Sequence, residues 1–260
     1  MNERTNNPIG VLSNSTLKII ACILMAIDHI GVHLFPNVEI LRIIGRLSMP
    51  IFAYLIAEGC YYTKNKLKHF LLIFISGLLF LIGILLFTKI TSGYYYWLGN
   101  IFLQFSLSIL YIYLLQFLKK FSFSGNYKIL KIITSIISFI LLLIPLIILH
   151  KVKIFGSNFL DYSYVMVTLT PVFISLFDLR DYIDHPIVKY IDNFYVRILI
   201  TTICLIFISN YYGDIQWYSL LSIPILLLYN GKVGIKGLKF AFYAFYPVHI
   251  IIIYIIKFFL

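Results

Sequence analysis

The stretch "LKIIACILMAIDHIGVHLF", Leu17 to Phe35, indicates the fold class of this chain. It is long and apolar enough to cross a bilayer as one helix, because about 20 such residues span the hydrocarbon core. Asp28, His29 and His33 interrupt it. Ionisable side chains inside a span usually face a bundle interior or a wet cavity and mark a pathway or a reaction centre. The stretch therefore predicts a transmembrane helix that carries functional groups.

The composition extends this prediction to the whole chain. Hydrophobic residues make up 61% of it and charged residues 12%, which is typical of a polytopic membrane protein. Only helices satisfy their backbone hydrogen bonds in lipid at this span length, so we expect an all-α helix bundle forming one domain over residues 1–260. Nine apolar runs predict nine spans, at residues 16–36, 43–62, 69–88, 98–118, 128–149, 161–178, 193–210, 213–230 and 240–259.

The formal charge of +11 follows from membrane topology. With the N-terminus in the cytoplasm, most of the 21 lysines and arginines fall on the cytoplasmic side, as the positive-inside rule expects. We therefore expect a multi-pass protein of a bacterial cytoplasmic membrane, with lipid and not nucleic acid as its surroundings. The basic residues that fall outside are Arg42, Arg46, Lys89, Lys151, Lys153 and Lys257.

Arg42 and Arg46 are candidate ion-pair partners for Asp28 of the first helix. They are four residues apart in "LRIIGRLSMPIFAYLIAEG", Leu41 to Gly59, and so share one face at the outer start of the second helix. Each can hold Asp28 as an ion pair, and Pro50 predicts a kink near Arg46. In the alternative interpretation, Asp28 and the histidines lie at a helix end and reach water near the headgroups.

Other polar residues are isolated in apolar runs. Asn100 opens the fourth run and Asp161 the sixth, where a helix cap is a more common role than catalysis. Glu58 either reaches the inner interface beside Lys64 or has a function. His249 lies in the middle of the last run beside a proline, which favours a functional role and makes it a candidate catalytic residue.

Several blocks of the chain resemble the TraX family, named for the F-pilin acetylase. They are "LKIIACILMAIDHIG", "LRIIGRLSMPIFAYLIAEG", "GNIF", "LDYS" and "LLYNGKVGIKGLKFAFYAFYPVHIIIIYII", in matching order from about residue 17 to the C-terminus. The resemblance implies an integral-membrane acyltransferase that takes acetyl-CoA from the cytoplasm and acetylates an acceptor across the bilayer. The F-pilin member acts on the N-terminal amine of pilin, so N-acetylation is the expected reaction.

Acetyl transfer to an amine needs a base, and histidine meets that need near neutral pH. A peptide α-amine has a reference pKa of about 8, against about 10.4 for lysine, which makes an N-terminus the easier acceptor. We expect His29 to be the general base and Asp28 to orient or tune it through Arg42 or Arg46. One of these arginines, or Asn100, would stabilise the thioester oxyanion. An acetyl-histidine intermediate stays open beside direct attack.

The segment "YNGKVGIKGLK" is the candidate site for acetyl-CoA. Its lysines and glycines can cradle phosphate, although the positive-inside rule alone also predicts lysines here. The candidate cofactor-binding residues are Asn230, Lys232, Lys236 and Lys239, with Tyr246 from the block that follows.

Other functions remain open at this stage. Buried charges and helices interrupted by proline also suit a transporter, but we find no inverted repeat, a feature of many transporters. A scaffold subunit and an O-acetyltransferase of a cell-surface glycan are further alternatives. The acceptor is a peptide or a glycan, and no metal site is expected.

Overall fold

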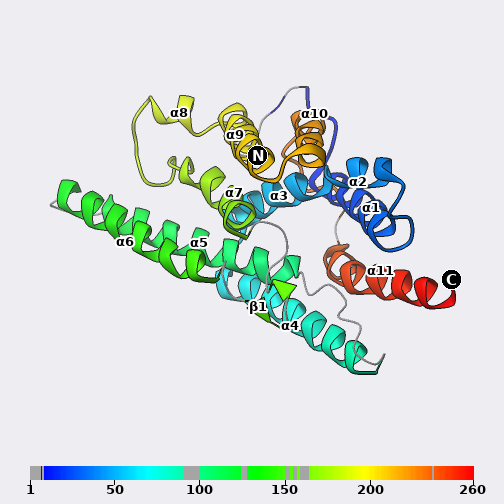
Figure 1. Ribbon diagram of the computed structural model, residues 1–260. Coiled ribbons are helices and arrows are strands. Elements are labelled where there is room, and N and C mark those ends of the chain that lie inside the picture. The colour runs from blue at the N-terminus through cyan, green and yellow to red at the C-terminus, as the bar shows by residue number, and fades with distance from the viewer. Residues whose placement is uncertain are drawn as a thin grey trace. The chain divides into compact units, whose positions relative to one another are not determined.

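The computed structural model describes residues 7, 9–90, 100–123, 128–149, 153–154, 157–158, 164–235 and 237–260. Its regular structure is helical, apart from one short antiparallel pair of strands, β1 Lys153–Ile154 and β2 Ser157–Asn158 (Figure 1). The all-α prediction is therefore confirmed. The helices are α1 Asn14–His33, α2 Glu39–Gly45, α3 Ser48–Tyr62, α4 Lys66–Ile90, α5 Ile101–Ser122, α6 Lys128–Leu149, α7 Tyr164–Leu176, α8 Val188–Ile191, α9 Phe194–Tyr212, the 3₁₀ helix η2 Asp214–Leu221, α10 Ser222–Leu227 and α11 Lys239–Phe259.

Six helical segments of the described chain are long and apolar enough to cross a membrane. They are Asn14–His33, Glu39–Tyr62, Lys66–Leu86, Ile101–Ser122, Phe194–Tyr212 and Phe240–Phe259. Two shorter apolar helices, Lys131–Leu141 and Val167–Leu176, lie within two of the other predicted runs. The predicted run 213–230 is divided between η2 and α10. The chain is thus a helical membrane protein, while the count of nine spans and the cytoplasmic N-terminus stay predictions.

Contacts between residues group the chain into two compact units. The first comprises Met1–Leu55 and Asp192–Leu260, and the second comprises Ile56–Ile191. Helix α3 contains the boundary between them. The prediction of a single domain is not tested by this grouping and stays a prediction.

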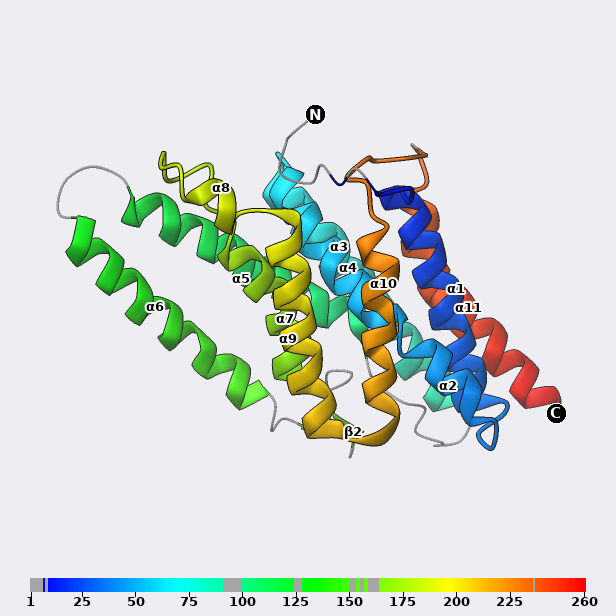
Figure 2. The same cartoon turned by 90° about the horizontal axis from the view of Figure 1, so that it is seen from above.

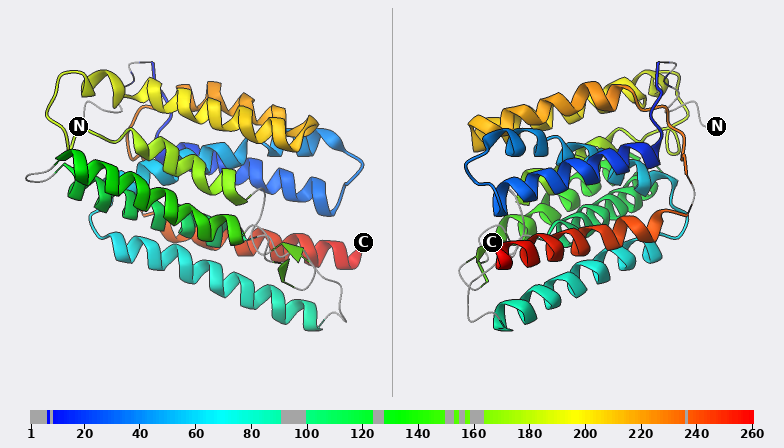
Figure 3. Two further views of the ribbon diagram at one scale, coloured as in Figure 1. Left: turned by 60° about the vertical axis from the view of Figure 1, so that its left-hand side comes forward. Right: turned by 90° about the vertical axis from the view of Figure 1, so that its right-hand side faces the viewer.

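In the first unit, α1 lies beside both α2 and α11 (Figures 2 and 3). Helix α2 ends at Gly45 and α3 begins at Ser48, so the predicted kink near Arg46 takes the form of a short break between two helices. Pro50 falls in the first turn of α3, where its missing N–H costs no helical hydrogen bond. The hydroxyl of Ser48 joins α3 to α1, because it donates to the carbonyl oxygen of Ala21 at 2.8 Å.

In the second unit, α5 is the central helix and contacts α4, α6 and α7. Asn100 caps α5, since its Oδ1 accepts from the backbone N–H of Leu103 at 3.2 Å. Its Nδ2 donates to the carbonyl oxygen of Gly77 on α4 at 2.7 Å. Leu103 packs against Phe74 and Leu81, so α4 and α5 meet closely at this point.

Gly77 and Gly83 on α4 form a matched pair for testing this packing. A Cβ at Gly77 would lie 2.9 Å from Leu103 Cδ2 and 3.0 Å from its backbone nitrogen, whereas a Cβ at Gly83 meets nothing within 4 Å. We expect Gly77→Ala to lower the free energy of unfolding by about 1–3 kcal/mol through overpacking. Gly83→Ala should raise it by up to about 1 kcal/mol through helix propensity. Thermal unfolding in detergent measures both, and a Gly77→Ala protein as stable as the parent would contradict the close contact.

Candidate functional site

Two buried histidines from opposite ends of the sequence meet in the first unit. His29 on α1 and His249 on α11 are 6% and 7% exposed. Their Nδ1 and Nε2 atoms, respectively, are 2.7 Å apart, and the two ring planes are nearly parallel, with an angle of 8° between them and centroids 5.0 Å apart. Their burial contradicts the alternative in which His29 simply reaches water at a helix end. The structure therefore brings together two residues that the sequence predicted separately.

The hydrogen bonds define which ring nitrogens carry protons. His249 Nδ1 lies 2.7 Å from the carbonyl oxygen of Phe245, which can only accept, so Nδ1 carries a proton. In a neutral ring, His249 Nε2 is then the acceptor, and His29 Nδ1 must donate to it. This tautomer leaves the lone pair of His29 on Nε2. A backbone carbonyl thus orients His249, which in turn orients His29.

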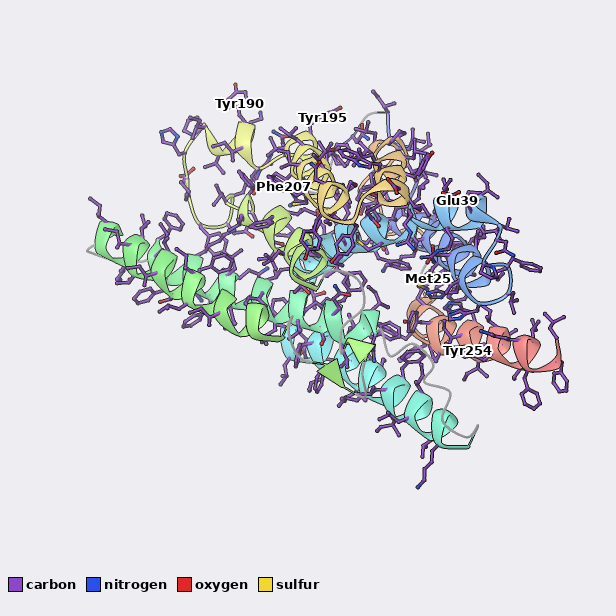
Figure 4. The ribbon with its side chains drawn as sticks, in the orientation of Figure 1. Met25, Glu39, Tyr190, Tyr195, Phe207 and Tyr254 are labelled. Carbon is purple, nitrogen blue, oxygen red and sulfur yellow. The ribbon has the colours of Figure 1, made fainter. Side chains whose placement is uncertain are left out.

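Aromatic side chains surround this pair. Tyr246 is buried, with its ring centroid 6.1 Å from that of His29 and 5.6 Å from that of His249. His33 lies one turn beyond His29, and its ring centroid is 5.0 Å from that of Tyr254 on α11. Figure 4 labels Met25, Glu39 and Tyr254, which identify α1, α2 and α11 around the site. The sequence assigned Tyr246 to cofactor binding, and the structure places it against the histidines.

Asp28 is held by both arginines that the sequence proposed. Arg42 Nη1 donates to Asp28 Oδ2 at 2.7 Å, and Arg46 Nη2 lies 3.5 Å from Asp28 Oδ1. The carboxylate is 7% exposed, the Arg46 side chain 9% and the Arg42 side chain 26%. The sequence left open which arginine pairs with Asp28, and both lie next to it.

Gln216 and Gly45 also contact the ion pairs between Asp28 and the two arginines. Arg46 Nη1 donates to Gln216 Oε1 on η2 at 3.4 Å, a contact that the sequence analysis missed. The sequence gives only a weak signal for Gln216, because it is a single amide side chain in a mostly apolar run. A Cβ at Gly45 would overlap the side chain of Asp28, so only glycine lets α2 approach α1 this closely.

Asn100 and Glu58 belong to the second unit. Asn100 is fully buried and caps α5, as the more common role for such a residue suggested. Glu58 is 2% exposed, so its side chain does not reach solvent beside Lys64. Asp161 lies outside the described residues.

The candidate acetyl-CoA segment meets the N-terminal end of α1. The backbone N–H groups of Asn14 and Ser15 donate to the carbonyl oxygens of Lys232 and Val233. Asn230 Oδ1 accepts from the N–H of Lys232 at 2.9 Å, so this side chain stabilises a local turn. The first N–H groups of α1 are therefore bonded to the backbone of this segment.

That segment and the start of α11 contain the three candidate lysines. Lys232 is exposed, Lys239 is the first residue of α11, and Lys236 lies outside the described residues. From Ser15 to His29, α1 rises by about 21 Å at 1.5 Å per residue. The segment and the histidine pair thus lie towards opposite ends of one helix.

Among the described residues, no group of three or more His, Cys, Asp or Glu side chains is placed to hold a metal ion.

Comparisons with known proteins give one family. The family model described as TraX protein matches residues 13–257. An uncharacterized protein of Rickettsia prowazekii (strain Madrid E) is 46% identical over 52 residues, which cover 20% of this chain and 21% of that protein. The chain thus aligns with about a fifth of the length of this relative. No solved structure matches.

Asp28 and Glu39 provide a matched test of the ion pairs. Asp28→Asn leaves two cations beside a neutral amide in a buried site, so we expect a loss of roughly 3–5 kcal/mol in the free energy of unfolding. Glu39→Gln, which removes an exposed carboxylate in the first turn of α2, should change it by less than about 1 kcal/mol. The measurement is Tm in detergent. Equal Tm values for the two variants would refute the structural role of Asp28.

Proposed function

Because this chain belongs to the TraX family, we propose that it is an integral-membrane acetyltransferase. It transfers the acetyl group of cytoplasmic acetyl-CoA to an amine on the outer side of a bacterial cytoplasmic membrane. The acceptor class that fits best is a peptide N-terminus, and a surface glycan is the alternative. The observation that carries the proposal is the hydrogen bond between His29 and His249, which orients a buried imidazole as a base.

In this proposal His29 Nε2 takes a proton from the acceptor amine as the nitrogen attacks the thioester carbonyl of acetyl-CoA. A C–N bond forms, and the carbonyl oxygen becomes an oxyanion. The C–S bond then breaks, and the proton on His29 passes to the leaving thiolate, which departs as CoA. The products are the acetylated amine and CoA, and His29 returns to its starting tautomer. His249 supports the charged intermediate by accepting from His29 Nδ1.

Arg46 is the favoured stabiliser of the oxyanion. It is buried in the same unit as the histidine pair, and a cation in a water-poor site stabilises the negative charge that develops during the reaction. Asp28 and Gln216 fix its guanidinium, so the group is oriented before reaction. Arg42, which is more exposed, and Asn100 in the second unit remain alternatives. Attack by His29 Nε2 itself, which would form an acetyl-histidine, uses the same atom.

The donor binds at the other end of α1 in this proposal. Lys232, Lys236 and Lys239 would hold the phosphates of acetyl-CoA from the cytoplasmic face, with the acetyl-bearing arm directed along α1 towards His29. Hydrogen bonds between residues 11–15 and residues 228–235 support this role, because they connect the backbone around Lys232 to the start of α1.

Purified protein in detergent tests the activity. With labelled acetyl-CoA and a peptide that has a free N-terminus, we expect release of CoA and transfer of label to the peptide. The same peptide with a blocked N-terminus should receive none. A transporter or scaffold would release no CoA with either peptide.

His29→Ala should lower kcat by about 10²–10⁴-fold, the usual contribution of a general base. His185→Ala removes an exposed histidine of the second unit and should leave kcat unchanged. His33→Ala should have a milder effect than His29→Ala. Activity of His29→Ala within tenfold of the parent would exclude His29 as the base.

Sidedness is tested with two single cysteines. Asn37→Cys, between α1 and α2, should react with an impermeant thiol reagent from outside the cell. Val233→Cys, whose parent residue is 68% exposed, should react only after the cytoplasmic face is opened. Background labelling should be low, because the three native cysteines are buried. Labelling of both positions from one side would overturn the proposed topology.

A further inference from the structure

His33 is a third histidine beside the proposed base, and the proposed transfer does not use it. It lies one turn beyond His29 on α1, and its Nε2 atom is buried. No described residue makes a hydrogen bond to this atom. A buried polar atom without a partner lowers stability, so such an atom in a native structure calls for an explanation. A ligand that donates to His33 Nε2 supplies one.

Buried aromatic side chains lie beside both imidazoles. The ring centroid of Tyr254 is 5.0 Å from that of His33, and the ring centroid of Tyr246 is 6.1 Å from that of His29. Both tyrosines are buried, so they limit the water that reaches the two histidines. A hydrogen bond in such a water-poor site is stronger than one in solvent. Because His29 Nδ1 is bonded to His249, Nε2 is the nitrogen of His29 that takes part in the proposed transfer.

The spacing of the two rings matches one amine nitrogen held by both. A hydrogen bond of about 2.9 Å to a ring nitrogen that is about 1.1 Å from the ring centre places the bonded atom about 4 Å from that centre. If two rings accept from one tetrahedral nitrogen, whose N–H bonds are about 109° apart, the ring centres are about 6.5 Å apart. The ring centroids of His29 and His33 are 6.3 Å apart. This separation permits a single nitrogen to donate to both histidines.

A neutral primary amine has two N–H groups and one lone pair. In the proposed transfer the lone pair forms the C–N bond, and one proton passes to His29 Nε2 and then to the thiolate that leaves as the C–S bond breaks. The second N–H stays on the nitrogen and remains in the amide product. It needs an acceptor in a buried site, and neutral His33 provides one at Nε2. A secondary amine or a hydroxyl group has a single hydrogen, which goes to His29.

We propose that His33 selects a primary amine as the acceptor, because its Nε2 accepts the N–H that the reaction does not use. His29 is the base, and His33 is a specificity-determining residue that holds the same nitrogen. The inference rests on the proposed acetyl transfer and narrows its acceptor. Peptide N-termini other than proline and the amino groups of amino sugars fit, whereas N-terminal proline and hydroxyl groups do not.

Two peptides that differ in one N–H test this selection. They have the same sequence, but one begins with alanine and the other with N-methylalanine. For the parent protein in detergent, we expect kcat/KM to be at least about tenfold higher with the alanine peptide, because a site that bonds a substrate N–H discriminates against an analogue without it. Equal kcat/KM values for the two peptides would overturn the proposal.

His33→Leu separates this hydrogen bond from a steric effect of the added methyl group, since leucine keeps most of the bulk and removes the acceptor. We expect His33→Leu to lower kcat/KM at least about tenfold with the alanine peptide and less than about twofold with the N-methylalanine peptide. His33→Gln, which places an amide oxygen near the position of Nε2, should keep most of the preference. Val32→Ala is the matched control at the adjacent, exposed position of α1 and should keep the preference of the parent.

The two kcat/KM values are compared within one preparation of each variant, so the fraction of folded protein cancels from their ratio. A preference that survives in His33→Leu would assign it to steric exclusion and overturn the role of His33. An equal loss of activity with both peptides would indicate a structural role and would also overturn it. Transfer to neither peptide by the parent would instead refute the proposed acetyl transfer. A parent that is active without preference refutes the role of His33 alone.

Discussion

An ionised carboxylate inside an apolar helix bundle is stable only beside cations, and Asp28 imposes this constraint on the first unit. Arg42 and Arg46 lie next to it, so α2 must approach α1 closely enough for both guanidinium groups to reach the carboxylate. Gly45 permits that approach because it has no side chain to collide with Asp28. Arg46 also bonds to Gln216, which ties η2 to the same charge. One buried carboxylate thus determines how several segments of this unit pack.

Helix α1 divides its polar residues between two neighbours. Asp28 and His29 are consecutive and point about 100° apart on a helix. Asp28 accordingly bonds to α2, and His29 bonds to His249 on α11. The charged carboxylate and the proposed base thus bond to two different helices. The carbonyl oxygen of Phe245 completes the arrangement, since it holds His249 in the tautomer that accepts from His29.

The proposed donor segment is connected to α1 through its backbone. The backbone carbonyls of Lys232 and Val233 accept from the first N–H groups of α1, while the Lys232 side chain is exposed. The positive-inside rule explains the lysines in this segment, but its hydrogen bonds to α1 are a property of the tertiary structure.

The sequence by itself determined the helical membrane class, the break near Pro50 and the pairing of Asp28 with arginines, because each follows from local composition, a local steric rule or the cost of a buried charge. Only the tertiary structure decided that His29 bonds to His249, 220 residues away, that Gln216 joins Arg46 and that Asn230 serves a turn. These contacts depend on the rotation and crossing of packed helices. Spacing along one chain specifies which residues share a face, but not which other helix that face meets.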